Sequence, residues 1–168
     1  IASIKGLLFD VNMSIQDKLV EQIGVIGEKL ELSNYCIIPG GYVSTYIHPG
    51  NKLVSLVGFN KIVDGVEEIG KNIAMQIAAM NPLGLTESDI SQEIIDKEIE
   101  IGKDLARQEG KPEEMLEKIS MGRLKKFFKE NTLINQIYIK DSKKTVMQYL
   151  KDSNQDLDIV AFKRVNLG

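Results

Sequence analysis

The sequence predicts an α+β fold in which antiparallel strands form a sheet and a pair of helices projects as a hairpin. Segments with the two-residue period of strands occur beside segments whose apolar residues recur at helical steps of three and four. The strand segments are joined by turns of a few residues, which connect antiparallel neighbours. Two charged helical segments meet at a Gly-Lys-Pro turn. With 168 residues, the chain is long enough for one compact domain with a hydrophobic core and an appendage to that domain.

The composition excludes several classes of protein. Hydrophobic residues make up 43% and charged residues 27%, unlike a disordered or a membrane protein. The net charge of -3 favours neither nucleic acid nor an acidic membrane. The single cysteine, Cys36, has no partner for a disulfide, which indicates a reducing cytoplasm. The missing initial Met leads us to expect a chain that begins inside a longer protein.

The first predicted helix begins after Ser14. The Ser14 side chain can cap the helix with Asp17 as its reciprocal partner, and apolar residues recur at four-residue steps between residues 15 and 23. Gly24 and Gly27 are expected to end it.

Three strand segments are predicted next. The first combines Leu30, Leu32 and residues 35–38, the second spans residues 42–47 and the third spans residues 52–59. Pro-Gly-Gly and His-Pro-Gly-Asn turns separate them.

A helix over residues 66–80 is predicted to pack closely against the sheet, because alanines accompany its apolar residues. Asn-Pro at residues 81–82 ends it. Near the end of the chain we predict an extended piece at residues 137–139, a helix over residues 142–150 capped by Ser142, and a strand over residues 158–165 that returns to the sheet.

The two charged helices, residues 91–109 and 112–130, are predicted to form the hairpin. Glycine after one helix and proline at the start of the next are typical of a tight reversal. A narrow apolar seam suits a single partner helix better than a broad core. The residues expected in the seam are Ile94, Ile101 and Leu105 in the first helix and Leu116, Ile119, Leu124, Phe127 and Phe128 in the second.

No group of residues predicts catalysis. His48 is the only histidine and Cys36 the only cysteine, so neither a metal site nor a nucleophile with its base can be assembled from them. Gly24 and Gly27 are not followed by the Gly-Lys-Ser/Thr of a phosphate-binding loop. We therefore expect no enzyme, no catalytic residue, no metal and no cofactor.

The one basic and aromatic stretch is Arg-Leu-Lys-Lys-Phe-Phe-Lys at residues 123–129. It could contact RNA through Lys125, Lys126 and Lys129. Phe127, however, continues the apolar seam of the hairpin, and neighbouring acids neutralise the lysines. We favour packing, and keep RNA binding and self-association through the hairpin as alternatives.

Five blocks of sequence are informative when they are read together, in order, over roughly residues 14 to 165. They are Ile-Gly-Glu-Lys-Leu at 26–30, Tyr-Ile-His-Pro-Gly-Asn at 46–51, Ile-Ala-Met-Gln-Ile-Ala-Ala-Met-Asn-Pro at 73–82, Gly-Lys-Pro at 110–112 with Gly-Arg-Leu-Lys-Lys-Phe at 122–127, and Lys-Asp-Ser-Lys-Lys-Thr-Val at 140–146. In this order and spacing the chain resembles the elongation factor Ts family, whose members release GDP from elongation factor Tu.

The resemblance implies the later subdomain of the factor's core, an antiparallel sheet with helices on one side that carries the hairpin as an insertion. Residues 1–25 would then be a remnant linker and helix of the preceding subdomain. Residues 26–90 and 131–168 would form the C-terminal core subdomain, and residues 91–130 the inserted coiled coil.

The family's earlier part includes a Thr-Asp-Phe motif that wedges into the nucleotide domain of elongation factor Tu. This sequence contains Phe9-Asp10 but no Thr-Asp-Phe. The resemblance therefore leads us to expect a truncated form.

The positions that touch elongation factor Tu in the family map here to Ile26 and Gly27 at a helix-to-strand junction, His48 in a turn, and Ile139 and Lys140 after the hairpin. Where the family often has Gln-Pro before an aromatic residue, this chain has Gln-Ile-Tyr just before Ile139. In the family, this half chiefly grips the third domain of elongation factor Tu.

The function implied by the resemblance is guanine nucleotide exchange on elongation factor Tu by the full-length protein, which would bind the GDP-bound and nucleotide-free forms. This chain would be a docking fragment with little exchange activity. The resemblance implies a cytoplasmic protein without a membrane or direct nucleic-acid partner, and a homodimer is left open.

Overall fold

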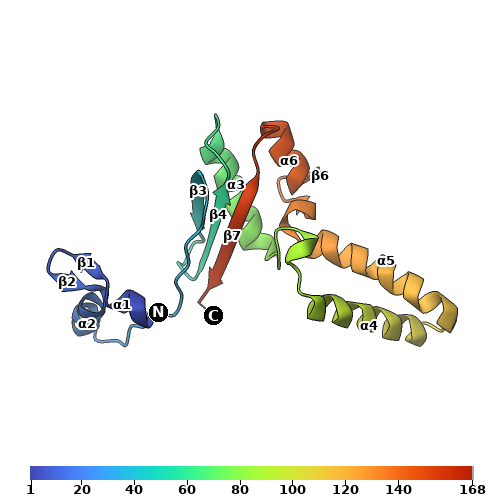
Figure 1. The fold of residues 1–168 in the computed structure, drawn as a ribbon, viewed down its shortest axis with the longest axis horizontal. Helices are drawn as coiled ribbons and strands as arrows, with labels where there is room; N and C mark the ends of the chain where they lie inside the picture. Colours follow the sequence, from blue (N-terminus) through green and yellow to red (C-terminus); the bar gives the residue numbers. More distant parts are fainter. Residues whose placement is uncertain (168) are drawn as a thin grey trace. The chain divides into compact units, whose positions relative to one another are not determined.

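The computed structural model describes residues 1–167, which form two compact units: the first spans Ile1–Ile37 and the second begins at Ile38. Each unit combines helices with antiparallel strands, as Figure 1 shows, so the predicted α+β class is confirmed. Within residues 1–167, no helix is long and apolar enough to cross a membrane. The expected domain boundaries, at residues 25/26, 90/91 and 130/131, stay predictions.

The first unit contains α1 (Ala2–Lys5), β1 (Leu8–Asp10), β2 (Met13–Ser14) and α2 (Ile15–Ile26). The predicted cap of α2 is confirmed, because Ser14 Oγ accepts a hydrogen bond from Asp17 N at 3.1 Å and Asp17 Oδ2 accepts one from Ser14 N at 3.1 Å. The helix runs through Gly24 and ends at Gly27, whose φ of 77° is left-handed and suits glycine.

The strand predicted from Leu30, Leu32 and residues 35–38 is wrong, because the structure gives this segment neither helix nor strand. Tyr35 and Ile37 are 55% and 76% exposed. A period of two produces a strand only where another strand pairs with the backbone and one face is buried. Neither condition is met here within residues 1–167.

The sheet of the second unit consists of β3 (Tyr42–Ile47), β4 (Leu53–Phe59) and β7 (Ile159–Asn166), in the order β3-β4-β7. Both pairs are antiparallel, with Ser44 opposite Val57 and Val57 opposite Phe162. The two adjacent strands and the returning last strand are therefore confirmed. The turn between β3 and β4 uses left-handed backbone at Gly50 (φ 93°) and Asn51 (φ 57°), two residue types that tolerate it.

Helix α3 (Val66–Met80), confirmed over its predicted range, packs against this sheet. A Cβ at Gly70 would lie 2.6 Å from the Cβ of Ser44, so glycine is what allows helix and strand to approach this closely. Ser55 Oγ of β4 donates a hydrogen bond to Ala74 O of the helix at 2.6 Å.

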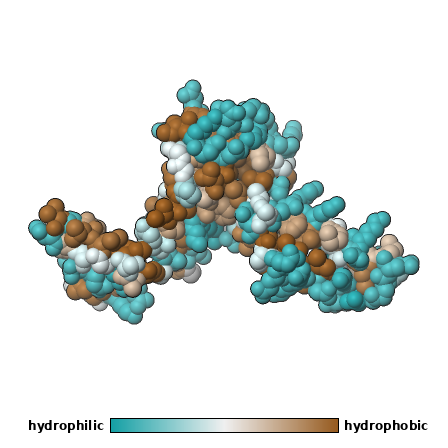
Figure 2. Space-filling model, viewed as in Figure 1, coloured by the Kyte–Doolittle hydropathy of each residue, from teal (hydrophilic) through white to brown (hydrophobic). Residues whose placement is uncertain are grey.

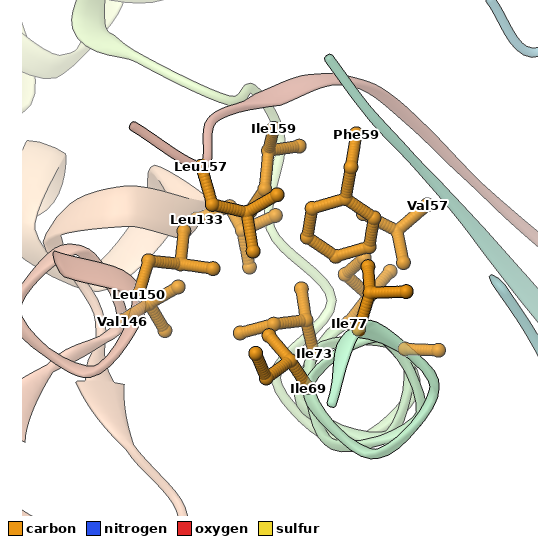
Figure 3. Packing of buried hydrophobic residues seen from close by; sticks show 12 residues of the cluster. Val57, Phe59, Ile69, Ile73, Ile77, Leu133, Val146, Leu150, Leu157 and Ile159 are labelled. Atoms are coloured by element: carbon orange, nitrogen blue, oxygen red, sulfur yellow. The ribbon is translucent and has the colours of Figure 1, made fainter. Parts of the chain in front are cut away.

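The hydrophobic core lies against the buried face of α3. In Figure 3, Ile69, Ile73 and Ile77 of this helix face side chains of β4 and of the C-terminal segment. The buried residues that they meet include Val57, Phe59, Leu133, Val146, Leu150, Leu157 and Ile159. Burying one such side chain stabilises the fold by roughly 1.5–3 kcal/mol, so this cluster fixes the position of α3 on the sheet.

The predicted hairpin consists of α4 (Gln92–Gln108) and α5 (Glu113–Asn131), preceded by the short 3-10 helix η1 (Glu87–Asp89). The helices lie side by side (Figure 1), and the turn contains Gly110 with a φ of 73°. Near the turn, Arg107 pairs with Glu113 at 3.0 Å and Arg123 with Glu109 at 2.7 Å. Figure 2 shows mostly hydrophilic residues on the visible face of the two helices.

The seam predicted for α4 is wrong. Ile94, Ile101 and Leu105 are 36%, 41% and 38% exposed, whereas Gly102 and Ala106 are buried. Small residues let the helix axes approach: a Cβ at Gly102 would lie 3.0 Å from the Cα of Ser120. On α5, Leu116 and Leu124 are buried as predicted, while Ile119, Phe127 and Phe128 are partly buried.

The segment after the hairpin contains η2 (Leu133–Asn135), β5 (Ile137–Tyr138), β6 (Asp141–Thr145) and α6 (Val146–Ser153). The helix predicted to start at Ser142 therefore starts later. Thr145 Oγ1 accepts a hydrogen bond from Gln148 N at 3.2 Å, and Gln148 Oε1 accepts one from Thr145 N at 2.7 Å. This reciprocal cap satisfies two backbone N–H groups, and the residues before it pair with β5 instead.

Candidate protein-docking site

A cavity of about 320 Å³ lies where the β3–β4 hairpin, α3 and the segment after β5 meet. Its lining consists of Tyr46, His48, Leu53, Met75, Ala78, Ala79 and Ile139. Two of the five predicted site residues, His48 and Ile139, thus share one cavity although they are far apart in the sequence. Two larger cavities, of about 420 and 410 Å³, lie against β7 and the base of α5, and their linings within residues 1–167 include none of these five residues. The second is lined in part by Lys126 and Lys129, two of the candidate RNA contacts.

His48 is held in place by its own backbone and by a neighbouring ring. His48 N donates a hydrogen bond to Leu53 O at 2.9 Å, and Asn51 N donates one to His48 O at 3.0 Å, which closes the turn. His48 Nδ1 lies 3.1 Å from Tyr46 Oη, and the two rings meet edge to face with centroids 6.0 Å apart. The imidazole is exposed yet oriented.

Helix α3 lines the cavity with side chains that are too small to fill it. Ala78 is buried and Ala79 is exposed, and their short side chains do not fill the cavity. Met75 is half-buried, and its flexible thioether can adapt to a guest side chain. The cavity is therefore an adaptable apolar hollow beside one imidazole.

Ile139 follows β5, and its side chain is 42% exposed. Its backbone N donates a hydrogen bond to Gln76 Oε1 of α3 at 2.8 Å. Ile139 therefore adds a partly exposed apolar side chain to the edge of the cavity.

Lys140 is exposed and does not line the cavity. Its Nζ donates a hydrogen bond to Asn72 Oδ1 at 2.6 Å, and Asn72 Nδ2 donates one to Tyr149 Oη at 2.9 Å. Tyr149 stacks on Tyr138 with ring centroids 4.2 Å apart. Burial raises the pKa of the Tyr138 hydroxyl, with the Tyr149 hydroxyl adding to the shift.

Ile26 and Gly27 belong to the first unit. Ile26 is the last residue of α2 and is 53% exposed, and Gly27 caps that helix. The helix-to-strand junction expected here is absent, because the segment that follows is not a strand within the described residues.

The lining of the cavity is suited to receiving an apolar group. It is mainly apolar and carries a single imidazole. Among residues 1–167, no group of three or more histidine, cysteine, aspartate or glutamate side chains could hold a metal ion. An apolar hollow with one oriented polar group is the kind of surface that binds a side chain of another protein.

Sequence reasoning missed Tyr46 and the α3 residues of the site. Tyr46 could have been found, because residues two apart in a strand point to the same face and His48 follows at that distance. Met75 and Ala78 share one face of a helix by their spacing of three. No local pattern, however, predicts that this face meets Ile139.

The comparison with known proteins is decisive for the family. The family model described as Elongation factor TS matches residues 1–168. The chain belongs to this family. The resemblance carried by the five blocks is thus confirmed, and the family's members are elongation factors of protein biosynthesis.

Relatives named Elongation factor Ts support the assignment. The one from Christiangramia forsetii is 54% identical over 156 residues, which cover 93% of this chain and 57% of the relative's own length. The one from Flavobacterium psychrophilum is 51% identical with the same coverage, and the one from Porphyromonas gingivalis is 45% identical over 155 residues, 92% of this chain and 56% of its own length. The chain spans just over half the length of these elongation factor Ts relatives.

Proposed function

We propose that the full-length protein is a guanine nucleotide exchange factor for elongation factor Tu, and that this chain is a part of it that docks on Tu. The proposal follows from membership of the elongation factor Ts family. The chain would bind both the GDP-bound and the nucleotide-free forms of Tu, in the cytoplasm. It would act as a binding protein and not as an enzyme.

The observation that carries the proposal is the cavity shared by His48 and Ile139. Both positions correspond to family positions that touch Tu, and they come from distant parts of the chain. The cavity offers a partner an apolar hollow, an exposed Ile139 side chain and an oriented imidazole. A pocket of this kind can receive an anchoring side chain of a partner.

The mechanism requires no bond to be made or broken. A factor that binds nucleotide-free Tu more tightly than nucleotide-bound Tu must lower the affinity of Tu for nucleotide by the same ratio, because the two equilibria are linked. A coupling of ~1–3 kcal/mol corresponds to a 5- to 150-fold change in affinity. Docking residues supply affinity, and the coupling depends on contacts that differ between the two states of Tu.

The test is a calorimetric titration of nucleotide-free Tu with this chain. His48→Ala should weaken binding by about tenfold or more, the loss typical of a hot-spot residue. Ile139→Ala should also weaken binding. The matched control is Ile62→Ala, which truncates another exposed isoleucine (70%) and should leave binding unchanged. Equal affinities for all four proteins would refute docking at this site.

The chain itself is proposed to release GDP poorly, since it contains no Thr-Asp-Phe motif. Stopped-flow measurement of labelled GDP leaving Tu should give rates far below those of a complete elongation factor Ts. Rates equal to those of the complete factor would contradict this part of the proposal.

Self-association through the hairpin is a second candidate function, favoured by the exposed face of α4 at Ile94, Ile101 and Leu105. Sedimentation equilibrium would detect a dimer. The candidate predicts that Ile101→Lys dissociates it, and a wild-type chain that remains monomeric at high concentration would eliminate this function.

A further inference from the structure

We infer that Gln76 is a positioning residue of the docking site, one that holds the segment carrying Ile139 against helix α3. The inference rests on the proposed function, since it concerns the same cavity. Gln76 itself does not line that cavity.

Gln76 lies in α3 and is completely buried. Its Oε1 accepts a hydrogen bond from Ile139 N at 2.8 Å, and its Nε2 donates to Ile137 O and to Gln136 Oε1, both at 3.1 Å. All three partners lie in one short stretch of chain. A buried amide that loses such partners leaves polar groups unpaired, which strongly favours the bonded arrangement.

Gln136 extends this connection to the ends of two helices. It is 1% exposed, and its Nε2 donates hydrogen bonds to Glu130 O in the last turn of α5 at 2.9 Å and to Met80 O at the end of α3 at 3.4 Å. Gln76 and Gln136 together therefore tie residues 136–139 to both helices. The two glutamine side chains thus hold this segment with hydrogen bonds that, in a longer strand, the backbone of a neighbouring strand would supply.

The local secondary structure does not by itself fix the backbone at Ile139. Strand β5 has only two residues, and its pairing with β6 is irregular, with Tyr138 opposite Asp141. Ile139 follows the strand, and its N–H is bonded to Gln76. An apolar residue of similar length could fill the same volume in the core, but it could not fix the Ile139 backbone.

The experiment compares Gln76→Met, which keeps the side-chain length and removes the hydrogen bonds, with Ser55→Ala. The control also removes one buried hydrogen bond to α3, that from Ser55 Oγ to Ala74 O, but Ser55 does not contact residues 136–139 through it. Affinity for nucleotide-free Tu is measured at a temperature where denaturant unfolding shows each variant to be folded. Amide hydrogen exchange at Ile139 is measured by NMR on the free chain.

We expect Gln76→Met to weaken binding about tenfold, which corresponds to ~1.4 kcal/mol, and to abolish protection of the Ile139 amide. Ser55→Ala should change neither. In the double variant with Ile139→Ala, Gln76→Met should cause little further loss, because the two residues act through one contact.

Three results would overturn the inference. They are an unchanged affinity of Gln76→Met, a loss no larger than that of Ser55→Ala, and full additivity in the double variant. If His48→Ala and Ile139→Ala bind like the wild type, the docking site itself is wrong and the inference falls with it. If those two variants bind weakly while Gln76→Met does not, only the positioning role is refuted.

Discussion

His48 has its orientation before any partner arrives. The hydrogen bond between His48 N and Leu53 O fixes its backbone, and Tyr46 Oη fixes its ring. A side chain that is ordered in the free protein loses less conformational entropy on binding. From the residues alone, His48 is best interpreted as an exposed turn residue, and only the family resemblance makes it a candidate contact; its partner Tyr46 required the geometry of the strand.

Tyr46→Phe tests the contribution of this orientation. The substitution keeps the ring in the cavity and removes only the hydroxyl bonded to His48 Nδ1. A net hydrogen bond of ~0.5–1.5 kcal/mol predicts that affinity for nucleotide-free Tu falls about two- to tenfold in a calorimetric titration. Tyr42→Phe is the control, since Tyr42 lies on the same strand but outside the cavity. A loss of affinity equal in both variants would contradict the prediction.

Asp17 connects the stability of α2 to pH. Hydrogen bonds from the Ser14 hydroxyl at 2.6 Å and the Ser14 N–H at 3.1 Å hold the pKa of the Asp17 carboxyl below its ordinary value. A carboxyl with a lowered pKa in the folded state stabilises the helix above its unfolded pKa, about 3.9, and loses this effect as the pH falls through the folded pKa.

An NMR titration should therefore show the Asp17 carboxyl titrating at lower pH in the wild type than in Ser14→Ala. The α2 amides should lose protection in the acid range as Asp17 is protonated. Identical midpoints in the two proteins would show that the Ser14 hydroxyl does not lower the pKa of Asp17.

Among the elements, the hairpin shows most clearly what periodicity can and cannot predict. The positions of its helices and of its turn could be read from the sequence, because glycine and proline mark the reversal. The seam of α4 could not, because burial selects the small residues Gly102 and Ala106 over the large ones. Close approach of two helix axes is a property of the pair, and one helix alone does not reveal it.

Gly102→Leu should destabilise the hairpin by roughly 1–3 kcal/mol, since even a Cβ at this position would meet the Ser120 backbone at 3.0 Å. Gly122→Ala on α5 is the matched control: nothing lies within 4 Å of its Cβ, so the change should stabilise the helix by up to ~1 kcal/mol. The free energy of unfolding in denaturant measures both. Stabilisation by Gly102→Leu would show that the helices do not pack as described.

The strand expected near Tyr35 and the helix expected from Ser142 failed for a similar reason. Each segment had suitable local residues. The strand, however, also needs a second strand to pair with its backbone. The helix starts at the reciprocal cap of Thr145 and Gln148, which satisfies more backbone N–H groups than the side chain of Ser142 alone could. At the two ends of α2, by contrast, residues of the same segment satisfy the free backbone groups of the helix, and the predicted caps are confirmed.

For the whole molecule, the order β3-β4-β7 brings the last strand back beside β4, a strand from the first half of the chain. Period and turns predicted these three strands but not which edge the last one joins, because strand pairing at a distance depends on the common core. The family resemblance supplied the sheet with helices on one side. It also implied five contact positions, Ile26, Gly27, His48, Ile139 and Lys140, without saying which of them lie together; the fold brings His48 and Ile139 to one cavity.

The most direct test of docking at this cavity is amide hydrogen exchange on this chain with and without nucleotide-free elongation factor Tu. The account predicts that Tu slows exchange in the segments that line the cavity: the β3–β4 turn around His48, α3 near Met75 and the backbone at Ile139. It predicts unchanged exchange at the α4–α5 turn around Gly110. Protection confined to the hairpin, with none around His48 and Ile139, would contradict it.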